Sequence, residues 1–259
     1  MSAGTGPALA PRRAGAVRGT MVVARRELGA YFDSSIAYAY LIAALVLLTT
    51  LYMNEFFLTG RLDMTPLFET LAPLSVFLLP AVTMRLWAED RKARTFELYV
   101  TLPLRSGQLV LGKYLAALAL YGLFLAGTLP VVVMLRALGE PDLGLIAAGY
   151  LGALLHGALL LALGSLLSAL TADQIVAFVA SVAVGFVVVL SGEPRVVAVL
   201  DGMAPELAPG SLIAGSLSSL PRYEALLGGL IELSSVLWFL GLSAACLWVE
   251  ALAVGRLRS

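Results

Sequence analysis

The chain has 259 residues, of which 60% are hydrophobic and 13% charged, and its mean hydropathy is +0.93. A soluble domain usually carries about a quarter charged residues, so this composition excludes a fully water-exposed surface and indicates lipid as the main solvent. The formal net charge is zero, and the single cysteine, Cys246, excludes an internal disulfide.

The N-terminal region is basic and lacks the pattern of a signal peptide, because no apolar stretch follows until Ile36. We expect residues 1–20 to form a flexible basic tail and residues 21–259 to form one membrane domain. Residues 21–32 show an apolar face at helical spacing, which predicts an amphipathic helix along the inner leaflet. A basic anchor beside the membrane is the alternative. The face consists of Met21, Ala24, Leu28, Tyr31 and Phe32.

Six segments approach the length of about 20 apolar residues that a helix needs to cross the hydrocarbon core. They predict an all-α integral membrane protein with six transmembrane helices. The segments are residues 36–53, 67–84, 114–135, 143–172, 174–192 and 233–249. Residues 193–232 contain four prolines and are too interrupted for a span. They predict short helices at the membrane surface.

The basic residues are concentrated on one side of this topology. Thirteen of the seventeen lie in the N-terminal segment, in the link between the second and third spans, or at the C-terminus. Cytoplasmic loops of membrane proteins collect lysine and arginine, so both termini and that link are predicted to be cytoplasmic. The remaining four are Arg61, Arg136, Arg195 and Arg222.

Motifs for catalysis are lacking. Residues 107–113 read G-Q-L-V-L-G-K and fit a phosphate-binding loop, but the next residue is Tyr114 instead of Ser or Thr and a membrane span follows. Hydrolase and zinc-site motifs are missing from the sequence. We therefore expect no catalytic, cofactor-binding or metal-binding residues, no enzyme activity and no nucleic-acid partner.

Within the spans, His156 is the one ionisable residue near a helix centre. We expect it to hydrogen-bond to a neighbouring helix, with a role in transport as the alternative. Small residues spaced four apart favour close helix packing, within the chain or between two chains. The positions concerned are Ala148 with Gly152, Ala153 with Gly157, and Gly241 with Ala245.

The link between the second and third spans is too ordered in pattern for a plain loop. Trp87 suits the membrane interface, and a mixed-charge cluster follows it. Residues 95–101 then predict a short amphipathic element that ends before Pro103, and Ser106 is expected to cap the next helix. A basic membrane anchor is one interpretation. The acidic and apolar residues favour a surface that docks another protein.

These residues carry a resemblance that spans the chain from about Val23 onward. The sequence resembles the permease subunits of type-2 ATP-binding-cassette (ABC) transporters, and within them the gliding-motility and copper-enzyme-maturation branch. The shared elements are A-E-D-R at 88–91, T-F-E-L at 95–98, T-L-P at 101–103, L-G-K-Y at 111–114 and G-L-I-E-L at 229–233. Where the family usually has glycine before the first threonine, this chain has Arg94.

The resemblance implies a dimeric permease in the cell (inner) membrane, an interfacial N-terminal helix and a cytoplasmic coupling helix that engages a separate ABC ATPase subunit. ATP and magnesium would bind that partner, and export is the implied direction. The implied coupling surface comprises Glu89, Asp90, Arg91, Thr95, Phe96, Glu97, Leu98 and Pro103. A non-transporting regulator or motility anchor is the first alternative, and a membrane-embedded enzyme the second.

Overall fold

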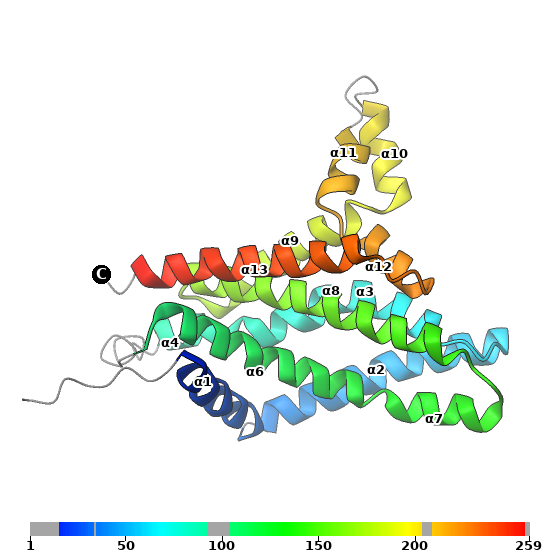
Figure 1. The fold of residues 1–259 in the computed structure, drawn as a ribbon, viewed down its shortest axis with the longest axis horizontal. Coiled ribbons are helices and arrows are strands. Elements are labelled where there is room, and N and C mark those ends of the chain that lie inside the picture. Colours follow the sequence, from blue (N-terminus) through cyan, green and yellow to red (C-terminus); the bar gives the residue numbers. More distant parts are fainter. Residues whose placement is uncertain (1–15, 34, 93–103, 204–208, 257–259) are drawn as a thin grey trace, which may run out of the picture.

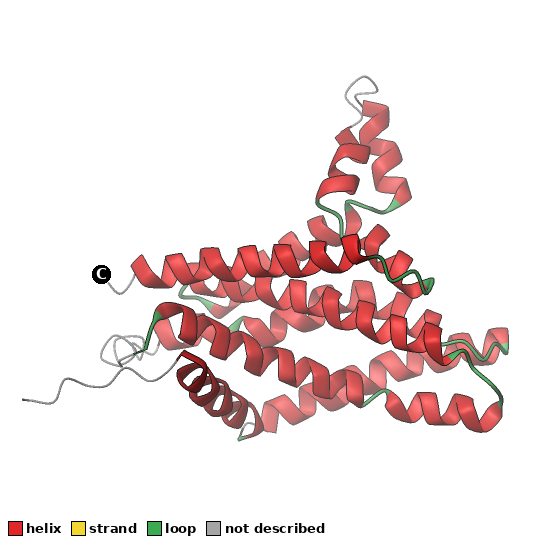
Figure 2. Ribbon diagram, in the orientation of Figure 1, coloured by secondary structure: helices red, strands yellow, loops and turns green. Residues whose placement is uncertain are grey.

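The computed structural model describes residues 16–33, 35–92, 104–203 and 209–256. All regular secondary structure within these ranges is helical (Figure 2). The prediction of an all-α protein is therefore confirmed for the described part of the chain. Of the expected tail, residues 1–20, only residues 16–20 lie in the described part of the chain. They belong to the first helix, α1 (Ala16–Phe32), which begins five residues before the predicted start at Met21.

Helix α8 (Leu143–Leu170) runs through the middle of the bundle (Figure 1). In its most apolar stretch 72% of the residues are buried, compared with 17% for α2 (Ser35–Thr59), so α8 is the central helix and α2 a peripheral one. The start of α8 is capped by Asp142, whose Oδ1 accepts hydrogen bonds from the N–H groups of Gly144 and Leu145 at 2.8 and 3.1 Å. Such a cap satisfies donors that the first helical turn leaves unpaired.

Five helical segments of the described chain are long and apolar enough to cross a membrane. They are Ala37–Thr59, Thr65–Lys92, Ser106–Leu138, Leu143–Leu170 and Leu233–Arg256. A sixth results if α9 (Gln174–Leu190) and α10 (Pro194–Met203), which meet at 84°, form one bent span. The six-span prediction agrees with the structure only if α9 and α10 form one span. Helix α9 alone has 17 residues, which is fewer than the about 20 that a membrane-crossing helix needs.

The second span extends further than predicted. Helix α3 (Thr65–Thr83) is followed after Met84 by α4 (Arg85–Lys92), and the two together form one apolar segment. The charged residues 89–92, which follow Trp87, thus belong to a helix. The side chain of Trp87 is 1% exposed and lies inside the bundle, so it contacts other helices instead of lipid head groups, and its depth at the membrane interface stays a prediction. The indole is large and apolar, and a partner for its N–H lies within the protein.

The third span is broken once. Helix α6 (Ser106–Ala126) ends before Gly127 and Thr128, and α7 (Leu129–Leu138) continues it. Pro130 has no N–H and therefore suits the first turn of α7. At the other end Ser106 is the first helical residue and not the cap. The backbone N–H of Arg105 at the cap position donates to Gln108 Oε1 at 2.7 Å.

The region between the fifth and sixth spans contains the predicted short helices, α10, α11 (Pro209–Ser216) and α12 (Leu220–Leu227). Helices α10 and α11 pair with each other and project from the bundle (Figure 1). Helix α12 instead packs against α8 and buries Tyr223 and Leu226. The final helix, α13 (Leu233–Arg256), continues past the predicted end at Val249, so Glu250 lies inside the helix.

Helix α1 packs along α6. Within the predicted apolar face Ala24 is buried and Leu28 and Tyr31 are partly buried, whereas Met21 and Phe32 are exposed; Val23, outside that face, is buried as well. The close approach depends on Gly112 of α6, where a Cβ would lie 2.6 Å from the Val23 Cβ. The start of α1, helix α4 and the end of α13 lie at the same end of the bundle (Figure 1).

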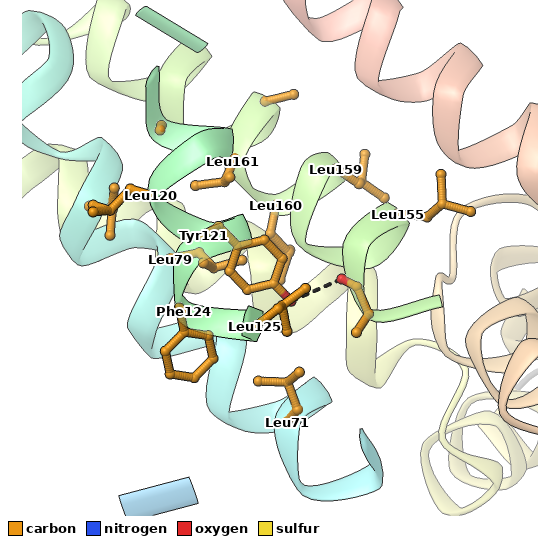
Figure 3. Packing of buried hydrophobic residues seen from close by; sticks show 14 of the residues in the cluster. Leu71, Leu79, Leu120, Tyr121, Phe124, Leu125, Leu155, Leu159, Leu160 and Leu161 are labelled. Carbon is orange, nitrogen blue, oxygen red and sulfur yellow. Dashed lines mark hydrogen bonds between the residues drawn. The ribbon is translucent and has the colours of Figure 1, made fainter. Parts of the chain in front are cut away.

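Leucine and aromatic side chains from α3, α6 and α8 form the centre of the core (Figure 3). Tyr121 of α6 crosses to α8, where its hydroxyl donates to the Ala153 carbonyl at 2.9 Å. Buried tyrosines usually pair their hydroxyl in this way. The bundle is therefore held by apolar contact together with a few side chain-to-backbone hydrogen bonds.

Candidate functional site

A cluster of buried and partly buried polar side chains surrounds α4 at the end of the bundle where the start of α1 and the end of α13 lie. We call this cluster the α4 junction. It consists of Glu27, Trp87, Asp90, Arg91, Lys113, Ser165, Ser168 and Glu250. Polar groups are rare in an apolar bundle of this kind, so their convergence on one short helix indicates a specialised region.

Lys113 of α6 lies at the centre of one half of the junction. Its side chain is 2% exposed, and Nζ lies 2.8 Å from Asp90 Oδ2 and 3.2 Å from Glu27 Oε1. Nζ also donates to the Leu86 carbonyl at 2.7 Å and lies 5.1 Å from the centre of the Trp87 ring. A buried ammonium needs this number of partners to offset its desolvation. Lys113 thereby joins α4 to both α1 and α6.

The other half of the junction is built around Glu250 of α13. Its side chain is fully buried, and Oε1 accepts hydrogen bonds from Trp87 Nε1 at 2.6 Å and from Ser165 Oγ at 2.8 Å. Oε2 has no hydrogen-bond partner in the described chain. These bonds connect the last span to α4 and to α8.

The C-terminal end of α8 is tied to α4 as well. The backbone N–H groups of Trp87 and Ala88 lie 3.2 and 3.3 Å from Ser168 Oγ, which itself donates to the Met84 carbonyl at 3.1 Å. Arg91 Nη1 donates to the Ala169 carbonyl at 2.8 Å. A cation is favourable there, because the last carbonyls of a helix lack partners and carry partial negative charge.

The neighbouring part of α1 is held by Tyr31, whose hydroxyl donates to the Val82 carbonyl of α3 at 3.2 Å. Burial raises the pKa of Tyr31 above its usual value, and the nearby Glu27 carboxylate raises it further. Tyr31 is therefore neutral at physiological pH and remains a hydrogen-bond donor.

Of the predicted coupling residues, three lie in the described chain. Glu89 pairs with Arg85 one turn earlier at 2.8 Å and keeps 47% of its side chain exposed. Asp90 and Arg91 point into the bundle and bind Lys113 and the end of α8. The predicted surface is thus divided, with Glu89 on the outside and its two neighbours holding α4 in place. Thr95, Phe96, Glu97, Leu98 and Pro103 lie outside the described residues.

His156 is buried in α8, as its position predicted. Its Nε2 lies 3.2 Å from Ser75 Oγ of α3, and its ring is 5.0 Å from that of Tyr223. The hydrogen bond to a neighbouring helix is therefore present, while Nδ1 has no partner in the described chain. Whether His156 also serves transport stays a prediction.

The three glycines predicted to allow close helix packing differ in how near a neighbouring helix lies. Gly152 faces α12, where a Cβ would meet Leu226 at 3.2 Å, and Gly157 faces Tyr121, where a Cβ would lie 2.1 Å from the ring. Gly241 of α13 is exposed, and a Cβ there would meet no atom of the described chain within 4 Å. Two of the three therefore allow close helix packing within the chain.

The sequence interpretation missed Lys113, Glu250 and Trp87 as site residues. The signal for Glu250 was present, because it interrupts an apolar stretch that continues through Ala251 to Val254. An ionisable residue in such a position is a candidate functional residue. Lys113 was assigned to a basic link and to the motif L-G-K-Y, and its partners Asp90 and Glu27 lie too far away in sequence for any local pattern to reveal them.

The opposite end of the bundle holds an open recess of about 590 Å³ between α11, α12 and α13. Arg222 stacks on the Trp238 ring with its guanidinium carbon 4.4 Å from the ring centre, and Glu232 also lines the space. No group of three histidine, cysteine, aspartate or glutamate side chains in the described ranges is arranged to hold a metal ion.

Comparison with known families identifies one match. Residues 34–220 match the family model described as ABC-2 family transporter protein, which covers well over half of the chain. No curated protein matches the sequence significantly. The matched region includes α2 to α10 and hence most of the α4 junction. Together with the apolar spans, this match shows that the chain is a multi-pass membrane protein that belongs to the ABC-2 family of transporter proteins, the membrane components of ABC transporter systems.

Proposed function

We propose that this chain is the permease subunit of an ATP-driven exporter, and that α4 with the link after it receives the movement of a separate ABC ATPase. The observation that carries the proposal is the α4 junction. Asp90, Arg91 and Trp87 hold α4 rigidly to α6, α8 and α13, while Glu89 stays half-exposed. One side of this short helix is exposed, and its other side is bound to several spans. It can therefore transmit a movement of a bound cytoplasmic protein to those spans.

The proposed setting includes a second permease chain and the cell (inner) membrane. The outward faces of α2 and α13 are strongly apolar; Ile42, Val46 and Leu237 are each about 60% exposed. Lipid or a second copy would cover such surfaces. The motifs quoted above favour the gliding-motility and copper-enzyme-maturation branch, and export follows from the same resemblance.

The first prediction concerns attachment of the ATPase. Reversing Glu89 and Glu97 together to lysine is expected to abolish copurification of an ABC ATPase, because it reverses the charge at half-exposed Glu89 and in the link after α4, where the ATPase is proposed to dock. The measurement is the amount of ATPase that copurifies from native membranes, with its vanadate-sensitive ATP hydrolysis. Glu55→Lys with Glu140→Lys is the matched control, since both residues are exposed and lie in the last turns of α2 and between α7 and α8, at the end of those helices away from α4 (Figure 1).

If the Glu89 and Glu97 double variant binds the ATPase normally, the hypothesis that these residues belong to the docking surface is wrong. Absence of an ATPase on the wild-type chain contradicts the permease assignment itself and favours the non-transporting component. Loss of binding in the control as well would show a general effect of added charge.

The second prediction concerns topology. A fluorescent protein fused to either terminus is expected to fluoresce in the cytoplasm, and alkaline phosphatase inserted near Asp201 is expected to be active outside. The physical reason is the concentration of basic residues at the end that carries α1, α4 and the end of α13. A fusion that fails to fluoresce at both termini contradicts the orientation, a failure at only one terminus contradicts the even number of spans, and an inactive phosphatase near Asp201 contradicts the placement of that residue outside.

A further inference from the structure

Besides the bonds of Ser168 and Arg91 to the end of α8, two buried charged residues connect helix α4 to other helices. Lys113 attaches it to α1 and α6, and Glu250 attaches it to α8 and α13. We propose that Glu250 is a positioning residue that makes α13, the last span, move with α4 when the ATPase acts. This inference rests on the proposed function, in which α4 receives that movement.

The burial of Glu250 indicates a role beyond packing. A fully buried carboxyl group loses its hydration, and that loss is offset only where both oxygens find partners. In Glu250 both donors bind Oε1, and Oε2 has no partner in the described chain. An apolar side chain of similar size would fill the same space without this cost. The residue is therefore explained better by the connection it makes than by stability.

The connection joins elements that otherwise have little to hold them together. The backbone of α4 packs chiefly against α8, and α13 packs along α8 and α6. The bond from Trp87 Nε1 to Glu250 Oε1 spans the gap between α4 and α13 directly, and Ser165 of α8 fixes the same oxygen from a second side. Trp87 is 1% exposed, so the indole cannot turn away without opening the core.

The outer side of α13 leaves this helix able to move. Trp248 is 66% exposed, Val249 44% and Leu252 47%, and they flank Glu250 on the outward side of the helix. Only 28% of the most apolar stretch of α13 is buried, against 72% for α8. The outward side of α13 has no neighbouring helix in the described chain, so this helix can shift along α8 and α6 together with α4, whereas the central helix α8 is enclosed by its neighbours.

The test uses the complex with its ATPase in lipid nanodiscs. Spin labels on Lys92 and Leu252, both exposed, report the distance from α4 to α13 in a Cys246→Ala background. We expect this distance to stay the same without nucleotide and with ATP plus vanadate. A second pair on Tyr38 and Leu252 is expected to change, because α13 moves relative to the peripheral α2.

Four variants isolate the bond from Trp87 to Glu250. Glu250→Leu removes the acceptor and Trp87→Phe removes the donor, so in each the Lys92–Leu252 distance is expected to change on addition of ATP, while ATPase binding is retained. Glu250→Gln keeps an acceptor oxygen and is expected to behave as wild type. The double variant Trp87→Phe with Glu250→Leu should match either single variant, because both remove the same bond. Wild-type behaviour of Glu250→Gln would show that the acceptor oxygen, and not the fold as a whole, is what Glu250→Leu loses. The thermal unfolding midpoint of each variant checks that it is folded.

A Lys92–Leu252 distance that stays constant on ATP addition in folded Glu250→Leu overturns the coupling role of Glu250 and leaves the proposed function intact. A wild-type Tyr38–Leu252 distance that does not respond to ATP also overturns it, because α13 then does not move. A wild-type chain that binds no ABC ATPase contradicts the proposed function and the coupling role together.

Discussion

Replacing Lys113 with methionine is expected to destabilise the folded protein by about 3 kcal/mol or more, since breaking a buried ion pair leaves an uncompensated buried charge. The stability is lost because two carboxylates no longer have the Lys113 ammonium as a partner. Asp90 and Glu27 have side chains only 20% and 16% exposed, and both lie against Lys113 Nζ. Methionine fills the space of the lysine stem but leaves these two negative groups facing each other.

The measurement is the thermal unfolding midpoint of Lys113→Met in one fixed detergent or nanodisc. Lys92→Met is the matched control, because Lys92 undergoes the same chemical change at the exposed end of α4. Adding Asp90→Asn to Lys113→Met is expected to recover part of the loss, since it removes one of the two carboxylates that lose Lys113 as a partner. Equal midpoints for Lys113→Met and Lys92→Met contradict the electrostatic role of the junction.

The second large effect is expected at Gly157, where alanine should destabilise the protein by about 1 to 3 kcal/mol through overpacking. A Cβ at this position would lie 2.1 Å from Tyr121 Cε1 and 2.4 Å from Cζ. The ring cannot move aside easily, because it is buried and its hydroxyl is bound to the Ala153 carbonyl one turn earlier on α8. The intrinsic gain of about 1 kcal/mol for alanine over glycine in a helix offsets only part of this clash.

Gly241→Ala is the control for Gly157→Ala, since a Cβ there would meet nothing within 4 Å in the described chain. We expect it to be neutral or slightly stabilising. Both variants are compared by thermal unfolding and by retention on size-exclusion chromatography. If Gly157→Ala is as stable as Gly241→Ala, the close approach of α6 and α8 is not required. A loss at Gly241 instead would point to a contact with a second chain.

The sequence predicted the spans well where apolar residues run without interruption. The fourth span was expected at residues 143–172, and α8 occupies Leu143–Leu170. Such predictions succeed because transfer of about 20 apolar residues into lipid is a local property of the chain. The ends were less accurate, and each large error involved a charged or polar residue. Lys113, Trp87 and Glu250 were all placed at or outside a boundary, and all three lie buried inside the bundle.

The errors at Lys113 and Glu250 have one physical cause. A hydropathy pattern treats every charge as one that must face water, whereas a charge can be buried if partners from other helices neutralise or hydrogen-bond it. The partners of Lys113 come from α1 and α4, and those of Glu250 from α4 and α8. The residue pairs Trp87–Glu250 and Ser165–Glu250 are 163 and 85 positions apart, so no local pattern links them.

By itself, the sequence determined that this protein is helical and spans a membrane, because composition and apolar run length decide how a chain partitions between water and lipid. Its motifs also indicated the ABC-2 family, which the family match confirms. Only the tertiary structure decided that Glu89 faces outward while Asp90 and Arg91 face inward, and that α4 is clamped to both sides of the bundle. Burial and pairing depend on which helices meet, and that is a property of the packed bundle.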